Sequence, residues 1–96
     1  MTISKPLVDA SVNVGTSQVT LLEAVAKRDF LVIANAHATQ ALWVNYTGGT
    51  AAANGLGCVQ IPALSNMRFD GFVPSNKITA IASGATTPVT VLHKSA

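Results

Sequence analysis

Short runs rich in Val, Ile, Leu, Thr and aromatic residues follow one another along the chain, and Gly, Pro, Asn or Ser separates each run from the next. Within these runs apolar and polar residues tend to alternate, which is the period of a half-buried β-strand and not that of a helix. The candidate strands are Ala10–Val14, Val19–Ala24, Phe30–Asn35, Leu42–Tyr46, Cys58–Ile61, Met67–Phe72, Ile78–Ala82 and Val89–His93. This spacing predicts an all-β fold, a single β-sandwich or jelly-roll-like domain of about seven to eight short strands.

Two segments depart from simple alternation. Thr20–Lys27 is the one place where a helix competes with a strand, but a segment this short without good caps makes only a turn or two. Phe30–Ile33 is apolar on both faces, so this strand is expected to be central and covered on each side. With 96 residues, the chain is expected to form an N-terminal arm, residues 1–9, and one β-sandwich domain, residues 10–96.

The only Trp of the chain lies in the candidate strand Leu42–Tyr46. By the period of two, Leu42, Val44 and Tyr46 share one face of this strand and Trp43 lies on the other. We expect the first set to form the core and Trp43 to point outward, where it becomes buried only on assembly. Burial within the subunit is the alternative, because Trp is large and often buried.

Other aromatic residues and a glycine-rich loop are further candidates for contact with a neighbouring subunit. Phe69 and Phe72 fall on opposite faces of their strand, and a sandwich this small cannot bury every ring in its own core. The loop Thr47–Gly57 has four glycines and no charge, so it either lies against another surface or forms a plain mobile tip. The candidate protein-interface residues are Trp43, Phe69, Phe72, Gly48 and Gly49.

The low charge of the chain bears on its partners. Charged residues make up 10% of the sequence, against about 25% in ordinary soluble domains. A surface with so few charges resists association poorly, so we expect a homo-oligomer. The net charge of +2 comes from scattered bases, which argues against nucleic-acid binding. No apolar run approaches the ~20 residues of a membrane span, and no secretory signal is visible.

The residues that usually carry chemistry are few and dispersed. His37, His93 and Cys58 have no nearby carboxylate in the sequence that would suggest a metal site. A triad of Asp70, His93 and some serine lacks any supporting motif. Asn45-Tyr46-Thr47 fits the glycosylation sequon, which we interpret as chance without a secretory signal. The sequence therefore predicts no enzymatic activity, no catalytic residue, no metal and no cofactor.

The order of segments between about residues 11 and 93 carries a resemblance. VNVGTSQVTLLEAVAKRDFLVIANA is followed by the Trp strand, the Gly/Thr/Ala loop, QIPALSNMRFDGFVPSNKITAIAS and TPVTVLHK. In this order the chain resembles small β-sandwich virion proteins of tailed bacteriophages. The strand with Arg28, Leu31, Ile33 and Asn35 and the segment Phe69–Pro74 match the pattern of that family. Where the family usually has Pro-Gly before the aromatic strand, this chain has Pro-Ala-Leu-Ser at residues 62–65.

The resemblance implies a structural virion protein made in the host cytoplasm: a capsid decoration (cement) protein, a head-fibre base or a tail-associated module. Low charge favours a decoration protein that binds the outer capsid surface and stabilises it. Its partners would be the major capsid protein and further copies of itself, most often as a trimer. The alternative is a tail- or fibre-associated adhesion module binding carbohydrate, with Trp43 and Tyr46 as a stacking platform. Their placement on opposite strand faces argues against that platform unless a bulge intervenes.

Overall fold

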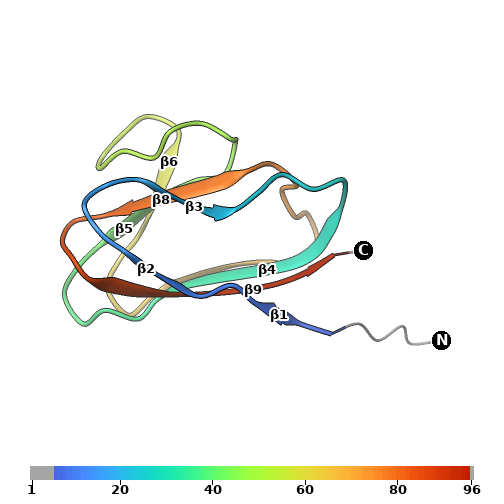
Figure 1. Ribbon diagram of the computed structural model, residues 1–96, viewed down its shortest axis with the longest axis horizontal. Helices are drawn as coiled ribbons and strands as arrows, with labels where there is room; N and C mark the ends of the chain where they lie inside the picture. The colour runs from blue at the N-terminus through green and yellow to red at the C-terminus, as the bar shows by residue number, and fades with distance from the viewer. Residues whose placement is uncertain (1–5, 96) are drawn as a thin grey trace.

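The computed structural model describes residues 6–95, and within them every regular element is a strand. Two antiparallel sheets face each other as the two layers of a β-sandwich (Figure 1). The strands are β1 (Val8–Asp9), β2 (Val12–Val14), β3 (Val19–Leu22), β4 (Arg28–Asn35), β5 (Leu42–Asn45), β6 (Cys58–Ile61), β7 (Asn66–Phe69), β8 (Ile78–Ala82) and β9 (Thr87–Ser95). The predicted all-β sandwich is confirmed.

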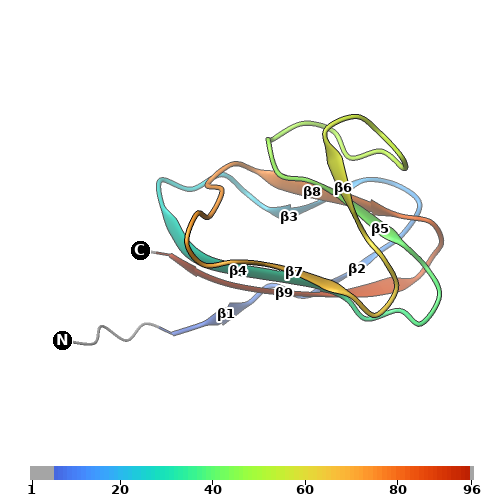
Figure 2. The ribbon, with the colours of Figure 1, turned by 180° about the vertical axis from the view of Figure 1, so that it is seen from behind.

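Neither sheet is built from one continuous stretch of the chain. The first sheet has the order β1–β9–β4–β7, with β2 pairing β9 beside β1, and the second has the order β3–β8–β5–β6. The long strands β4 and β9 form the centre of the first sheet, and β7 lies at its edge next to β4 (Figure 2). The prediction that the apolar strand beginning near Phe30 is central is confirmed. Its outward residues are only half-buried, so that face is less covered than expected.

The described residues form nine strands, where about seven to eight were expected, because Val8–Asp9 (β1) adds a strand within the expected N-terminal arm. β1 and β2 both pair with β9 in the same register, and Ala10 and Ser11 separate them. Asp9 Oδ1 accepts hydrogen bonds from the Ser11 amide and hydroxyl, at 2.9 and 2.5 Å. Val8 and Asp9, expected in the arm, therefore belong to the first sheet, whereas residues 1–5 lie outside the described residues.

The segment in which a helix competed forms no helix, because its first three residues belong to β3 and residues 23–27 are an irregular connection. Val19–Leu22 pairs with β8, with a register shift between Thr20 and Leu22. Leu21 and Leu22 are both buried, so apolar burial against the opposite sheet replaces the helical turn that the local sequence allows. Tertiary packing commonly overrides such weak local preferences.

The core lies between the sheets and is built from alternate residues of the inner strands. The apolar residues with no exposed surface are Val14, Leu31, Ile33, Leu42, Val44, Ile78, Ala80 and Val91. Burying a Val, Leu or Ile side chain stabilises a fold by about 1.5–3 kcal/mol, so this layer supplies most of the driving force for folding. The prediction that Leu42 and Val44 face the core is confirmed.

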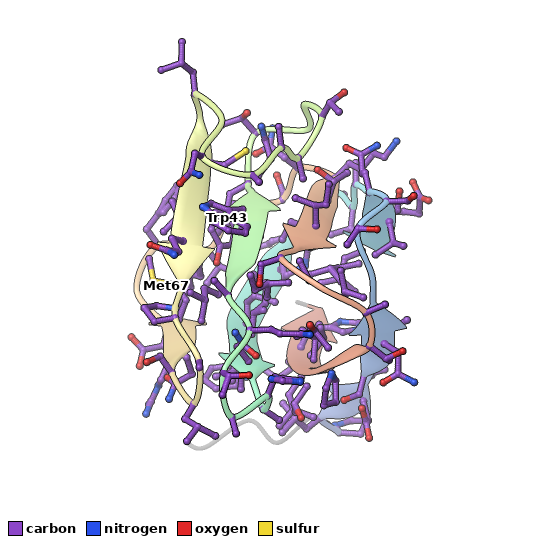
Figure 3. The ribbon with its side chains drawn as sticks, turned by 90° about the vertical axis from the view of Figure 1, so that its left-hand side faces the viewer. Trp43 and Met67 are labelled. Atoms are coloured by element: carbon purple, nitrogen blue, oxygen red, sulfur yellow. The ribbon has the colours of Figure 1, made fainter. Side chains whose placement is uncertain are left out.

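One flank of the core, between β6 and β7, is closed by larger side chains. Met67 and Phe69 lie on β7 opposite the buried Ile33 and Leu31, and both pack partly buried against the core. Figure 3 shows the position of Met67. The Phe69 ring meets the Tyr46 ring edge to face, with centroids 5.0 Å apart and an interplanar angle of 68°. This arrangement is favourable for two aromatic rings.

The Tyr46 hydroxyl is buried and has no hydrogen-bond partner among the described residues. Burial raises the pKa of this hydroxyl well above its usual range. Because a buried unsatisfied polar group costs about 1–3 kcal/mol, we expect Tyr46→Phe to leave the free energy of unfolding unchanged or to raise it by about 1 kcal/mol. Urea unfolding followed by circular dichroism measures the difference. A loss of more than about 1 kcal/mol would mean that the hydroxyl is satisfied in solution.

Candidate protein-interaction surface

The charged side chains are confined to one half of the sandwich. They are Asp9, Glu23, Lys27, Arg28, Asp29, Arg68, Asp70, Lys77 and Lys94, and Lys5 lies outside the described residues. The strand registers set the boundary, because Arg68 pairs with Val32, Val32 with Leu92, and Leu92 with Asp9. The other charged residues lie beyond this row, toward the end of the sandwich where β4 begins and β9 ends (Figure 1). We call this the charged end.

The opposite end carries no Asp, Glu, Lys or Arg among the described residues, and we call it the uncharged end. It is made of the connections 15–18, 36–41, 62–65 and 83–86. The sequence from Phe30 to Met67 contains no charged residue at all. Depletion of charge is the compositional mark of the buried centre of a protein interface. The uncharged end is therefore the candidate interaction surface.

Asn35 holds two connections of the uncharged end together. It ends β4, is 1% exposed and faces the loop that follows. Its Nδ2 donates to the carbonyl oxygens of Gln40 at 2.8 Å and Ile61 at 3.0 Å, and its Oδ1 accepts from the amide of His37 at 3.0 Å. His37 Nδ1 in turn accepts from the amide of Gln40 at 2.9 Å. These bonds fix the backbone of both connections, so the surface is pre-formed.

The connection from β6 to β7 is a tight turn with an unusual residue at its tip. Ser65 N donates to Pro62 O at 3.1 Å across the turn, and Leu64 N donates to His37 O at 3.2 Å. Leu64 has a φ of 59°, the left-handed conformation that the third residue of a type II turn requires and that Gly or Asn usually supplies. A β-carbon in this conformation costs roughly 1–2 kcal/mol. The Leu64 side chain is also 71% exposed, so burial within the subunit does not offset that cost.

The glycine-rich loop between β5 and β6 lies on its own second sheet. Asn45 Oδ1 accepts from Thr47 N at 2.9 Å and Gly49 N at 3.2 Å, and Thr79 Oγ1 donates to Gly49 O at 2.8 Å. Asn45 and Thr79 pair across β5 and β8 on the outer face, and Ala51 in the loop is buried. The loop was expected either to lie against another surface or to form a mobile tip, and the structure shows neither, because it packs on the outer face of its own sheet.

These contacts also explain the Asn-Tyr-Thr sequence. Asn45 is buried, and its side-chain oxygen is occupied by the backbone two and four residues ahead. Asn and Thr at this spacing form a local turn that starts the loop. The amide that glycosylation would modify is therefore folded against the sheet.

Trp43 lies on the predicted face but is not exposed. It points away from the core side chains of β5, and its cross-strand partners are Gln60 on β6 and Ile81 on β8. The side chain lies beside β6 and below the β5–β6 loop (Figure 3), and it is only 8% exposed. The expectation that Trp43 becomes buried only on assembly is wrong. The outer face of the sheet and its covering loop enclose the indole within the subunit.

The other predicted interface residues fall into two groups. Phe69 is partly buried against the core and Tyr46, so it is not a free surface anchor. Phe72 is 78% exposed and lies at the charged end. Gly48 and Gly49 are exposed at the start of the β5–β6 loop, and Gly48 has a φ of 88° with open space around it. The structure does not gather Trp43, Phe69, Phe72, Gly48 and Gly49 into one patch.

A shallow hollow of about 450 Å³ opens at the charged end beside Phe72, with Lys27, Asp29, Asp70 and Lys94 among its lining residues. Arg28 lies behind it, buried, and its guanidinium donates to the carbonyl oxygens of Pro74 and Glu23. Arg28 thus ties the β3–β4 connection to the β7–β8 connection. Burial of the His93 side chain, and to a smaller extent the charge of Arg28, lower the pKa of His93.

Residues that carry catalytic or metal chemistry are not brought together in the part of the chain that the structure describes. Within residues 6–95, no three His, Cys, Asp or Glu side chains are placed to hold a metal ion. His37 lies at the uncharged end and His93 on β9 near Arg28. None of the described elements is a helix with the length and apolar character to cross a membrane.

Sequence reasoning missed the structural roles of three residues, which are Asn35 and Leu64 at the uncharged end and Arg28 at the charged end. Arg28 and Asn35 were noted only as part of the resemblance. No neighbouring residue in the sequence indicated that their side chains bind backbone carbonyl groups. Leu64 had a visible signal, because Pro-Ala-Leu-Ser fills a turn that usually carries Gly.

No family model, curated protein or solved structure matches this chain. The resemblance to bacteriophage virion proteins stays a prediction.

Proposed function

We propose that this protein is a non-enzymatic structural virion protein, a capsid decoration protein that binds the outer capsid surface as a symmetric oligomer and stabilises it. The observation that carries this proposal is the confinement of charge to one half of the sandwich. A small domain with an uncharged end is suited to burying that end against protein while the charged end faces solvent.

The construction of the uncharged end supports the same proposal. Asn35 and the hydrogen bonds around His37 hold its connections in one conformation before binding. A pre-formed surface loses less conformational entropy when it docks than a mobile one. In a symmetric oligomer each copy repeats the contact, so modest individual contacts add up to firm attachment. Trimeric symmetry fits this proposal, with the major capsid protein and further copies of the chain as partners.

The test is binding to tailed-phage capsids that lack their decoration protein. We expect the wild-type protein to cosediment with such capsids and to raise the temperature at which they open. Ala38→Glu places a charge on an exposed residue of the uncharged end, and it is expected to abolish cosedimentation because burying an unpaired charge is costly.

Asn76→Glu is the matched control, since it adds the same charge at an exposed position of the charged end. It is expected to bind as the wild type does. Equal binding by both variants, or no binding by the wild-type protein to any capsid tested, would reject the proposal.

A second candidate function is that of a tail- or fibre-associated adhesion module binding carbohydrate, and one observation favours it. The exposed Phe72 ring borders the hollow lined by Lys27, Asp29, Asp70 and Lys94, and an aromatic face beside hydrogen-bonding groups can bind a sugar. Trp43 and Tyr46 do not form a stacking platform for a sugar. Trp43 is enclosed on the outer face of the second sheet, and Tyr46 packs against the core. Glycan-array binding that is lost in Phe72→Ala would support this function, and an array without signal would exclude it.

A further inference from the structure

We propose that the protein self-associates head to tail, with Leu64 of one copy inserted into a hollow between β2 and β9 of the next copy. This inference rests on the proposed function in one respect, because it specifies how the symmetric oligomer forms. Its evidence is a pair of features on the chain, one protruding and one recessed.

Leu64 is the protruding feature. Its side chain is mostly exposed at the uncharged end, and its backbone holds the left-handed conformation that disfavours a β-carbon. In the isolated subunit Leu64 lowers stability through its strained backbone conformation, and its apolar side chain gains nothing from burial. Strained residues that persist in a well-determined setting commonly mark a site of function. A leucine at a position suited to glycine is explained if its side chain is buried by a partner.

The hollow is the recessed feature. It has a volume of about 210 Å³ and is lined by Ser11, Val12, Asn13, Pro88, Val89 and Thr90, none of them charged. Val12 is 39% exposed there, so the lining offers an apolar surface that an incoming side chain would cover. The hollow is open, and Val12 and Pro88 are the apolar residues exposed in its lining, so an incoming leucine side chain would cover them.

The positions of the two features determine the symmetry of the contact. Leu64 precedes β7, which is one edge of the first sheet, whereas β2 pairs with β9 at the other edge. Figure 3 looks onto the uncharged end, with β6 and β7 on one side of the view and the N-terminal strands on the other. Two different surfaces in contact make a heterologous interface, and such an interface closes into a ring when the rotation between copies allows it. A head-to-tail contact gives either a ring or an open chain of copies, and the symmetric oligomer of the proposed function requires the ring.

The first test removes the protruding side chain. Leu64→Gly suits the backbone conformation, so the variant should fold, and at concentrations where the wild type is monomeric its urea unfolding midpoint should equal or exceed that of the wild type. Its self-association, measured by analytical ultracentrifugation over a range of concentrations, should weaken at least ~30-fold, the loss typical of an interface anchor. Leu56→Gly is the matched control, because Leu56 is fully exposed on the β5–β6 loop, and it should associate as the wild type does.

The second test uses mixing. Asn13→Arg places a long charged side chain over the hollow, and it should also give a folded monomer. In a head-to-tail contact each defective variant keeps the surface that the other lacks. An equimolar mixture of Leu64→Gly and Asn13→Arg should therefore form a heterodimer of one copy each, which cannot extend further. Thr20→Arg, an exposed charge on β3, is the control and should leave self-association intact.

The outcomes separate this inference from the proposed function. A monomeric wild-type protein, full association of Leu64→Gly, or a mixture that stays monomeric would each overturn the head-to-tail contact. These measurements contain no capsid. A protein that associates as described but does not cosediment with capsids would instead contradict the proposed function and leave the self-contact standing.

Discussion

Trp43→Ala is expected to lower the free energy of unfolding by about 3–5 kcal/mol, the usual cost of truncating a buried Trp. The indole is 8% exposed between β6, β8 and the β5–β6 loop, and removing it opens a cavity under that loop. Because a domain of this size has a total stability of about 5–15 kcal/mol, the loss is a large fraction of the whole. Urea unfolding monitored by circular dichroism measures the effect.

Trp43→Phe is the matched variant, because it keeps an aromatic ring at the same place. We expect it to lose clearly less stability than Trp43→Ala, since more of the volume stays filled. If Trp43→Ala unfolded at the wild-type midpoint and failed only to assemble, the ring would be an interface anchor and its burial within the subunit would be refuted.

Asn35→Ala is expected to lower the free energy of unfolding by about 3 kcal/mol, because three backbone groups lose their partner and each buried unsatisfied group costs about 1–3 kcal/mol. The carbonyl oxygens of Gln40 and Ile61 lose the amide donor, and the amide of His37 loses its acceptor. Part of this cost is relieved where water reaches the half-buried His37 and Gln40. Urea unfolding gives the magnitude, and hydrogen exchange at the uncharged end shows where the backbone opens.

Asn66→Ala is the control, since Asn66 is an exposed amide at the neighbouring end of β7. It should change the free energy of unfolding by no more than about 0.5 kcal/mol. If Asn35→Ala and Asn66→Ala proved equally mild, the side chain of Asn35 would not hold the connections as the structure indicates.

The asymmetry of charge has a further consequence for assembly. Leu64 and the residues that line the hollow carry no charge, and Asp9 beside the hollow is already bound by Ser11, so their contact should depend little on ionic strength. An interface formed by the charged end would instead weaken as salt screens its ion pairs. The salt dependence of self-association therefore reports which end of the sandwich is in contact.

The sequence by itself determined the approximate positions of eight of the nine strands and the alternation that faces the core. The alternation in Leu42–Tyr46 correctly placed Leu42 and Val44 inward and Trp43 outward, because the side-chain period of a strand depends only on backbone geometry. The strands Cys58–Ile61 and Ile78–Ala82 were predicted with the bounds that the structure has. The boundary between β1 and β2 was missed, since it depends on hydrogen bonds of Asp9 and Ser11 beside β9.

Only the tertiary structure decided what covers each outward face. Trp43 was expected to be exposed because alternation shows only which face of a strand a residue lies on. It does not show that Asn45 and Thr79 hold the β5–β6 loop over that face. The separation of charge was equally hidden, because residues as distant in sequence as Asp9, Arg68 and Lys94 reach the same half only through the pairing of strands. Long-range pairing sets both features, and local sequence patterns do not record it.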